Sequence, residues 1–192
     1  VSRGGSAIQS WTPKDFALLN PATRYYANLF QKHRDQINVF NQASDQARLA
    51  RESCRKDAVT PARLPEDLAL ANRFGGVASL YDNFVEPLAP FAVRGVIWYQ
   101  GESNGDHLET ARVYDTMLHD LINGWLARWA QPQMPWFLVQ LPGWDSPYAV
   151  HWPWVRQGQL IASRSLLHVG MIPTCDSGDS ANLHPPQKRE VG

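Results

Sequence analysis

The fold is decided by one short apolar run, Val93-Arg94-Gly95-Val96-Ile97-Trp98-Tyr99. β-Branched and aromatic residues dominate this run, which is typical of a parallel strand that is buried on both faces. The run ends at a polar, glycine-rich segment, Gln100-Gly101-Glu102-Ser103-Asn104-Gly105. Because ligands bind beyond the carboxyl ends of the strands in a parallel sheet, this segment is predicted to form part of a binding site.

Strands and helices alternate on the C-terminal side of this run. We expect a helix over residues 111–129, a strand over 136–141, a helix over 154–163 and a strand over 166–172. Asp106 and Glu109 have the spacing of a capping pair at the start of the first helix. The alternation predicts right-handed crossovers and a parallel sheet that helices cover on both sides.

The N-terminal side of the run is predicted to be helical. Apolar residues recur at helical spacing over residues 24–56, which indicates one long amphipathic helix, with a break near Asn41 as an alternative. Residues 57–76 contain prolines and glycines and are predicted to form a loop with a short helix around residues 66–71. A helical turn or two is expected within residues 77–91.

Composition restricts the class of protein and of ligand. The 192 residues are 44% hydrophobic and carry 18 basic and 18 acidic side chains, which favours one globular domain with no net charge. Such a chain has no overall field to hold a nucleic acid or an anionic membrane, so a small or neutral ligand is expected. No apolar run approaches the roughly 20 residues of a membrane span. Cys54 and Cys175 are too few for a disulfide framework or a cysteine metal site, and their pairing stays open.

Three loops follow the predicted strands, at residues 100–104, 142–145 and 174–185. The first contains a carboxylate, amides and a hydroxyl, and the third contains carboxylates and a histidine, so together they hold the parts of a Ser/His/acid hydrolase. Residues 101–105 also match Gly-x-Ser-x-Gly between a strand and a helix. One interpretation is therefore an α/β-hydrolase with Ser103 as its nucleophile.

A second interpretation rests on resemblance. Residues 95–104 are similar to the signature segment of the sialate O-acetylesterase family, which are carbohydrate acetylesterases of the SGNH hydrolase superfamily. Further segments that resemble this family lie at residues 2–11, 80–91, 114–125, 135–142, 154–159 and 176–188. The resemblance implies an α/β three-layer sandwich with a parallel sheet. It also implies hydrolysis of O-acetyl esters on sialic acid or an acetylated polysaccharide, with no metal or organic cofactor, in a secreted or periplasmic protein.

The resemblance assigns roles to individual residues. His184 matches the family's catalytic base, and the acid that orients it is Glu102, Asp179 or Asp176, in that order of preference. The family's nucleophilic serine lies in a Gly-Gln-Ser-Asn-like segment upstream of the Gly4-Gly5 block, and no such segment occurs in these residues. We therefore expect residues 1–192 to be a single, N-terminally truncated SGNH-type domain that is inactive alone.

The same resemblance suggests groups that bind the substrate. The backbone of Gly5 and the side chains of Gln100 and Asn104 are the candidates for stabilising the oxyanion. Trp144 is placed to stack on a sugar ring or to pack in the core, and Arg156 either lines the pocket or pairs with a carboxylate.

Simpler roles exist for several of these residues. Glu102 and Asn104 could cap the following helix, and Asp176 and Asp179 could form turns. A non-catalytic carbohydrate-binding domain is the remaining alternative to an esterase.

Overall fold

A computed structural model of the chain describes residues 3–53, 61–89, 91–184 and 189. Its α-helices are α1 (Lys14–Ala17), α2 (Pro21–Lys32), α3 (Arg34–Glu52), α4 (Glu66–Phe74), α5 (Leu108–Arg112), α6 (Tyr114–Trp129) and α7 (Trp152–Ser165). The strands are β1 (Val96–Trp98), β2 (Trp136–Val139) and β3 (Val169–Ile172). Shorter helical turns lie at Ile8–Ser10, Tyr81–Val85, Glu86–Leu88, Asn104–Asp106 and Pro147–Ala149.

The three strands form a parallel sheet in the order β1-β2-β3. Ile97 pairs with Phe137, and Phe137 pairs in turn with Gly170. Helices α5 and α6 connect β1 to β2, and α7 connects β2 to β3, so the predicted α/β class and parallel sheet are confirmed. All three strands are shorter than the apolar runs that predicted them. Strand β2 is two residues shorter and β3 is three residues shorter, and β1 keeps only three of the seven residues of its run.

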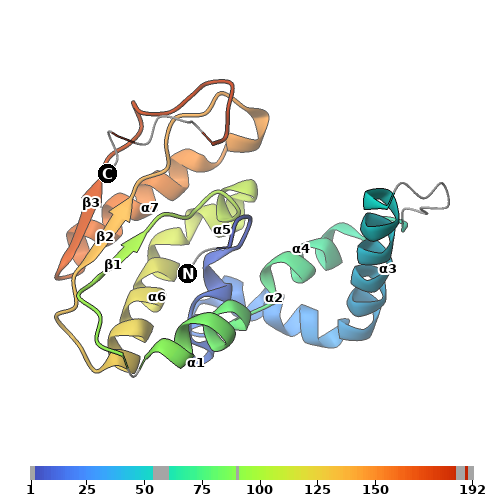
Figure 1. Cartoon of the computed structure of the whole chain (residues 1–192), viewed down its shortest axis with the longest axis horizontal. Coiled ribbons are helices and arrows are strands. Elements are labelled where there is room, and N and C mark those ends of the chain that lie inside the picture. Colours follow the sequence, from blue (N-terminus) through green and yellow to red (C-terminus); the bar gives the residue numbers. More distant parts are fainter. Residues whose placement is uncertain (1–2, 54–60, 90, 185–188, 190–192) are drawn as a thin grey trace.

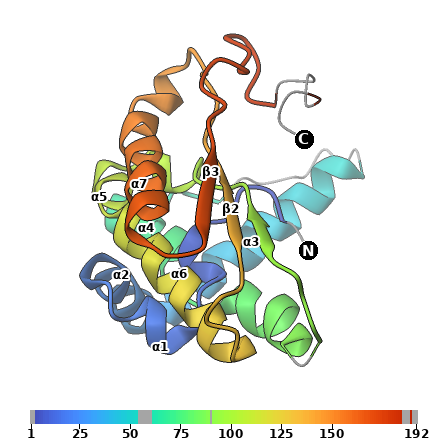
Figure 2. The ribbon, with the colours of Figure 1, turned by 90° about the vertical axis from the view of Figure 1, so that its left-hand side faces the viewer.

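Helices α6 and α7 cover one face of the sheet (Figure 2). The core between them contains Trp98, Trp136 and Leu138 from the strands. On the helical side it contains an apolar stripe of α6 and the inner face of α7: Tyr114, Leu118, Leu121, Ile122, Val155 and Ala162. This packing of alternate strand residues against two helices is what holds the strand ends in place.

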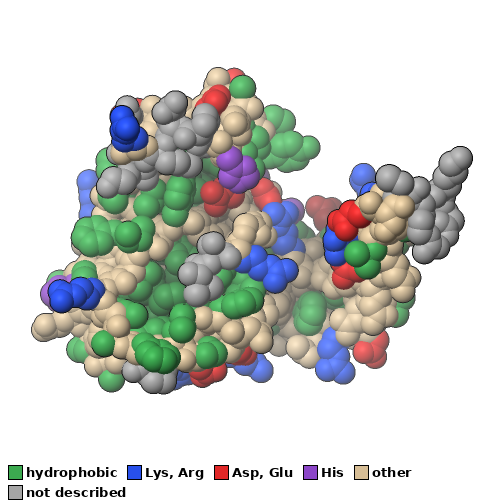
Figure 3. All heavy atoms as spheres, in the orientation of Figure 1, with side chains coloured by type: hydrophobic (Ala, Val, Ile, Leu, Met, Phe, Trp, Pro, Cys, Tyr) green, Lys and Arg blue, Asp and Glu red, His purple; other side chains and the backbone are tan. Residues whose placement is uncertain are grey.

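The opposite face of the sheet is largely uncovered within the described residues. Ile97 is 76% exposed and its cross-strand neighbour Phe137 is 49% exposed. Figure 3 shows hydrophobic side chains on this side of the molecule, over the strands. The prediction that the first strand is buried on both faces is therefore wrong for this part of the chain. Of the three layers expected, the described residues form two: the sheet and one layer of helices.

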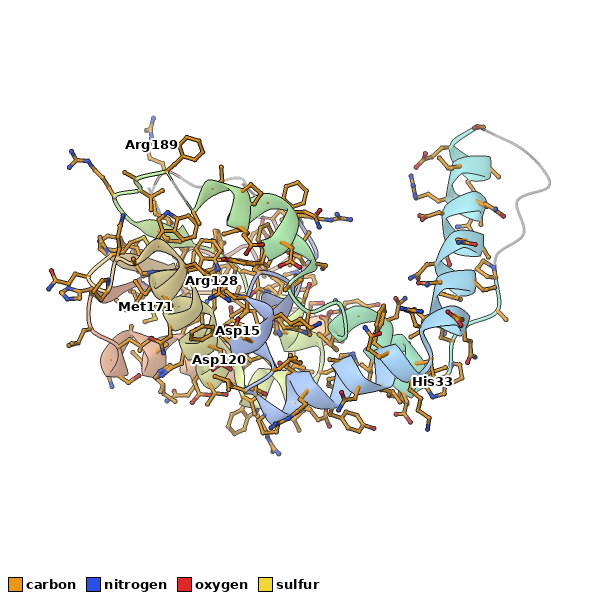
Figure 4. All side chains as sticks on the ribbon, turned by 90° about the horizontal axis from the view of Figure 1, so that it is seen from below. Asp15, His33, Asp120, Arg128, Met171 and Arg189 are labelled. Atoms are coloured by element: carbon orange, nitrogen blue, oxygen red, sulfur yellow. The ribbon has the colours of Figure 1, made fainter. Side chains whose placement is uncertain are left out.

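Two predicted long helices are each divided by one residue outside helical geometry. His33 (φ −115°, ψ 20°) separates α2 from α3, so the break lies there and not near Asn41 (Figure 4). Val113 (φ −107°, ψ 15°) separates α5 from α6. The expected Asp106–Glu109 capping pair is not formed: the N-cap of α5 is His107, without a side-chain cap, and Asp106 forms an ion pair with Arg73 of α4.

Helices α2, α3 and α4 form an arm that projects from the rest of the molecule (Figure 1). Within the arm, the side-chain amides of Asn41 on α3 and Asn72 on α4 bond reciprocally, at 3.0 and 2.8 Å. The arm meets the remainder of the chain in a small apolar cluster of Ala7, Tyr26 and Phe74. No helix among the described residues has the length and hydropathy that crossing a membrane would require.

Candidate functional site

A crevice of about 780 Å³ lies at the carboxyl ends of β2 and β3. The segment after β2 contributes Trp144 to its lining, the segment after β3 contributes Cys175 and Asp176, and α7 contributes Arg156. Two of the residues predicted to bind substrate, Trp144 and Arg156, are thus brought together with one of the candidate acids. This is the position at which parallel sheets bind ligands.

Close backbone packing fixes the two segments against each other. The backbone N–H of Asp145 donates to the carbonyl of Ser180 at 3.3 Å. A Cβ atom on Gly178 would overlap the backbone of Gly143, so glycine is required at this contact. Since both segments emerge from adjacent paired strands, the walls of the crevice are set by the sheet.

Trp144 and Arg156 each have a structural contact as well as a surface on the crevice. The Trp144 ring is stacked on Tyr148, with centroids 6.5 Å apart and an angle of 18° between the planes, and it also packs on buried Trp152. Arg156 donates from Nη1 to the carbonyl of Pro142 at 3.2 Å. A guanidinium held at one nitrogen keeps further N–H donors for a ligand.

The candidate base and two candidate acids share the third loop. His184 is exposed, and its backbone N–H donates to the Asn182 side chain at 2.9 Å. Asp179 accepts the N–H of Ala181 at 2.9 Å, which is a turn-forming bond. Among the described residues, no hydrogen bond or ion pair joins the His184 ring to Asp176 or Asp179. The identity of the orienting acid therefore stays a prediction.

The first loop is built around two buried amides. Gln100 donates from Nε2 to the carbonyl of Ser6 and to Oδ1 of Asn104, both at 3.0 Å. Asn104 also accepts the backbone N–H of Ile8 at 3.0 Å, and its own Nδ2 donates to the Gln9 side chain at 3.2 Å. Both side chains therefore join the loop after β1 to the N-terminal segment.

That N-terminal segment forms a tight turn at Gly4 and Gly5. Gly5 has φ +68°, a left-handed conformation that favours glycine. The turn is closed by the Ser6 hydroxyl, which donates to the carbonyl of Arg3 at 2.8 Å and accepts from Trp11 Nε1 at 2.8 Å. Because the Ser6 hydroxyl is engaged on both sides, it is not placed as a nucleophile.

Ser103 and Glu102 follow β1 directly. Ser103 is buried and has ordinary helical geometry (φ −64°, ψ −32°), whereas the nucleophile of an α/β-hydrolase is exposed on a strained turn. Glu102 is half-buried. Burial is the main cause of a raised pKa at the Tyr114 hydroxyl, and the negative charge of Glu102 contributes in the same direction.

Three polar residues organise this region: the sequence did not assign a polar role to Gln9 or Tyr114, and it left Gln159 either lining the pocket or paired with a carboxylate. Gln9 and Tyr114 bond to the amides of Asn104 and Gln100, and Gln159 of α7 donates to backbone carbonyls at the ends of β1 and β2. The available signal was the position of Gln159 on the face of α7 that buries Val155 and Ala162. Among the described residues, no three His, Cys, Asp or Glu side chains are grouped so as to hold a metal ion. Cys175 is a free, exposed thiol, and Cys54 lies outside the described residues.

Comparison with solved structures finds a similar fold. The chain resembles a carbohydrate acetylesterase from Xanthomonas citri with a TM-score of 0.64 and 23% sequence identity. The match covers 98% of this chain and 32% of that protein, so the chain spans about a third of its length. A comparison with curated proteins finds no match.

Comparison with protein families gives a match over more than half of the chain. Residues 69–191 match the family described as "Carbohydrate esterase, sialic acid-specific acetylesterase". The matched region includes all three strands, the crevice and the loops that follow the strands. The chain therefore belongs to the sialic acid-specific acetylesterase family of carbohydrate esterases.

Proposed function

We propose that the chain is the part of a carbohydrate O-acetylesterase that binds the sugar and supplies the base of a Ser/His/acid mechanism. The single observation that carries the proposal is the crevice at the ends of β2 and β3, lined by Trp144 and Arg156, in a chain of this family. An aromatic ring beside a guanidinium and carboxylates matches the needs of a sugar, which presents an apolar ring face and hydroxyl groups. The substrate is an acetylated sialic acid or an acetylated polysaccharide.

His184 is the proposed general base. It takes the proton from a serine hydroxyl as the serine oxygen attacks the acetyl carbonyl, and it then protonates the departing sugar oxygen. A water molecule that gives its proton to the same histidine then attacks the acetyl-enzyme, which releases acetate and restores the serine. The serine comes from polypeptide outside residues 1–192, and Glu102 holds the imidazole in the required tautomer. The exposure of His184 supports a base that a serine from another segment can reach, and the half-burial of Glu102 directly after β1 supports an acid held by the sheet.

The backbone N–H of Gly5 is the proposed donor to the oxyanion. Gln100 has already donated both hydrogens of Nε2, and Nδ2 of Asn104 faces Gln9 and the sulfur of Met117. Within the described residues, the N–H of Gly5 has no hydrogen-bond partner. Gln100 and Asn104 therefore hold the turn, and Gly5 presents the donor.

Release of acetate tests this proposal. In a longer form that carries the upstream segment, His184→Ala should lower kcat by about 10³-fold or more, with little change in stability because the side chain is exposed. His168→Asn, which changes another exposed histidine, is the matched control and should retain activity. A loss of less than tenfold in His184→Ala would remove this residue from the mechanism.

A further inference from the structure

A chain of buried hydrogen bonds runs from the arm to the turn at Gly5. It starts at the carbonyl of Phe74, the last residue of α4, which accepts Nε2 of Gln9 at 3.2 Å. Oε1 of Gln9 accepts Nδ2 of Asn104 at 3.2 Å, and Oδ1 of Asn104 accepts Nε2 of Gln100 at 3.0 Å. Nε2 of Gln100 also reaches the carbonyl of Ser6 at 3.0 Å. The three side chains are 2%, 0% and 8% exposed, so water does not compete for these bonds.

Both ends of this chain fix the orientation of every amide within it. The carbonyl of Phe74 can only accept, which places the nitrogen of Gln9 toward α4. At the other end, the carbonyl of Ser6 can only accept, which places the nitrogen of Gln100 toward the turn. Reversing any one of these amides would place two donors or two acceptors against each other at two or more contacts. Gln9 thus links the end of α4 to the two amides that hold the backbone of the turn, in the orientation that all three side chains share.

We propose that Gln9 is a positioning residue that orients the turn at Gly4–Ser6 and couples it to the seating of α4. Gln9 acts on the backbone of the turn through the two amides that follow it in the chain of bonds. Oδ1 of Asn104 accepts the N–H of Ile8, and Nε2 of Gln100 donates to the carbonyl of Ser6. Gly5 directly precedes Ser6, whose carbonyl is one of these anchors, and has a left-handed conformation. The link to catalysis rests on the proposed function, because Gly5 matters to the reaction only as the oxyanion donor.

Hydrogen exchange in the 192-residue chain tests the coupling without any activity. Gln9→Met keeps the length of the side chain and removes both polar ends. We expect the amide of Ile8 to exchange at least about tenfold faster than in the wild type and the resonances of Gly4 and Gly5 to shift. Asn72→Ala is the matched control. Asn72 lies on α4, as Phe74 does, and its substitution breaks the amide pair with Asn41 on α3, which is outside the chain of bonds. It should leave these signals unchanged.

Gln9→Glu provides a reversible second variant. A protonated carboxyl can donate to Phe74 and accept from Asn104 as the amide does, whereas a carboxylate can only accept. The wild-type resonances of Gly4 and Gly5 should therefore return as the pH is lowered through the titration of this buried acid. Unchanged Ile8 exchange in Gln9→Met, or loss of the folded state in both variants at every pH, would overturn the proposal.

Kinetics in a longer, active form separates the two proposals. Gln9→Met should lower kcat about tenfold or more while KM changes less than about threefold, because the oxyanion donor serves the transition state. Asn72→Ala should change neither. If the longer form has no esterase activity, the proposed function fails, and the exchange measurement still decides the role of Gln9.

Discussion

Gln159 donates from its side-chain amide to the carbonyl of Gln100 at 3.3 Å and so ties α7 to the end of β1. The same nitrogen reaches the carbonyl of Val139 at 3.2 Å, and Oε1 accepts the N–H of Leu141 at 3.1 Å. One fully buried side chain thereby satisfies backbone groups where β1 and β2 end. The spacing of the loops after these strands depends on this contact.

Replacing Gln159 should therefore lower the stability of the folded chain. Gln159→Met keeps the side-chain volume but removes the bonds to Val139 and Leu141, whereas the carbonyl of Gln100 keeps the Tyr114 hydroxyl as a partner, and we expect a loss of about 3 kcal/mol in the free energy of unfolding. Gln157→Met, at an exposed position of the same helix, should change it by less than about 0.5 kcal/mol. Urea unfolding of the two variants measures both values. Equal, small changes would show that the buried amide contributes nothing to the joining of β1 and β2.

Gly101 should not tolerate a side chain. Its φ is +153°, and an added Cβ would lie 2.6 Å from Cγ1 of Val155 and 3.2 Å from Leu141. Gly101→Ala should lower the free energy of unfolding by about 1–3 kcal/mol through overpacking. Gly4→Ala is the control, because a Cβ there would meet no atom within 4 Å. Thermal unfolding distinguishes them, and an equally stable Gly101→Ala chain would refute the close approach of α7 to this loop.

Asp120 on α6 should make stability depend on pH (Figure 4). Burial raises the pKa of its carboxyl from 3.8 to about 6, so the folded state favours the protonated form. Stability should fall as the pH rises from about 4 to about 6, where the unfolded chain has already ionised. Because the side chain is partly exposed, Asp120→Asn should gain only about 1 kcal/mol at pH 7 and nothing near pH 4. An equal gain at both pH values would exclude titration as its cause.

Three carboxylates compete for the role of orienting His184. Glu102 follows β1 at once and is held by the sheet, whereas Asp176 and Asp179 lie in a loop and Asp179 is engaged in a turn. Glu102→Gln should therefore lower kcat by about 10²-fold or more in an active, longer form, and Asp176→Asn and Asp179→Asn by less than tenfold. Steady-state kinetics on an acetylated sugar measures all three. The largest loss in an aspartate variant would transfer the role to that aspartate.

The arrangement of strands and loops was predictable because it depends on local pattern. The apolar run before Gln100 and the alternation of strands and helices after it predicted a parallel sheet and the edge at which the crevice lies. The exposure of Ile97 was not predictable, because an apolar strand has the same pattern whether or not a neighbouring layer covers it. The break at His33 was also hidden, since α2 buries Tyr26 and α3 buries Ile37 with similar periodicity on either side.

Bonding between distant polar residues was the other unpredictable part. Trp144 and Arg156 line the crevice, which is one of the two roles that the sequence left open for each. The roles of Gln100 and Asn104 could not be assigned, because their partners Ser6, Ile8 and Gln9 lie more than 90 residues away in the chain. The sequence alone does not indicate whether the side-chain amide hydrogens of a glutamine or an asparagine are already hydrogen-bonded.

Acetate release from an acetylated oligosaccharide tests the central claim most directly, when the 192-residue chain is compared with a longer form that carries the upstream segment. We predict that the longer form releases acetate, that this activity is lost in its His184→Ala variant and retained in its Ser103→Ala variant, and that the 192-residue chain alone is inactive. Robust hydrolysis by the 192-residue chain that disappears in Ser103→Ala would contradict the claim and identify Ser103 as the nucleophile.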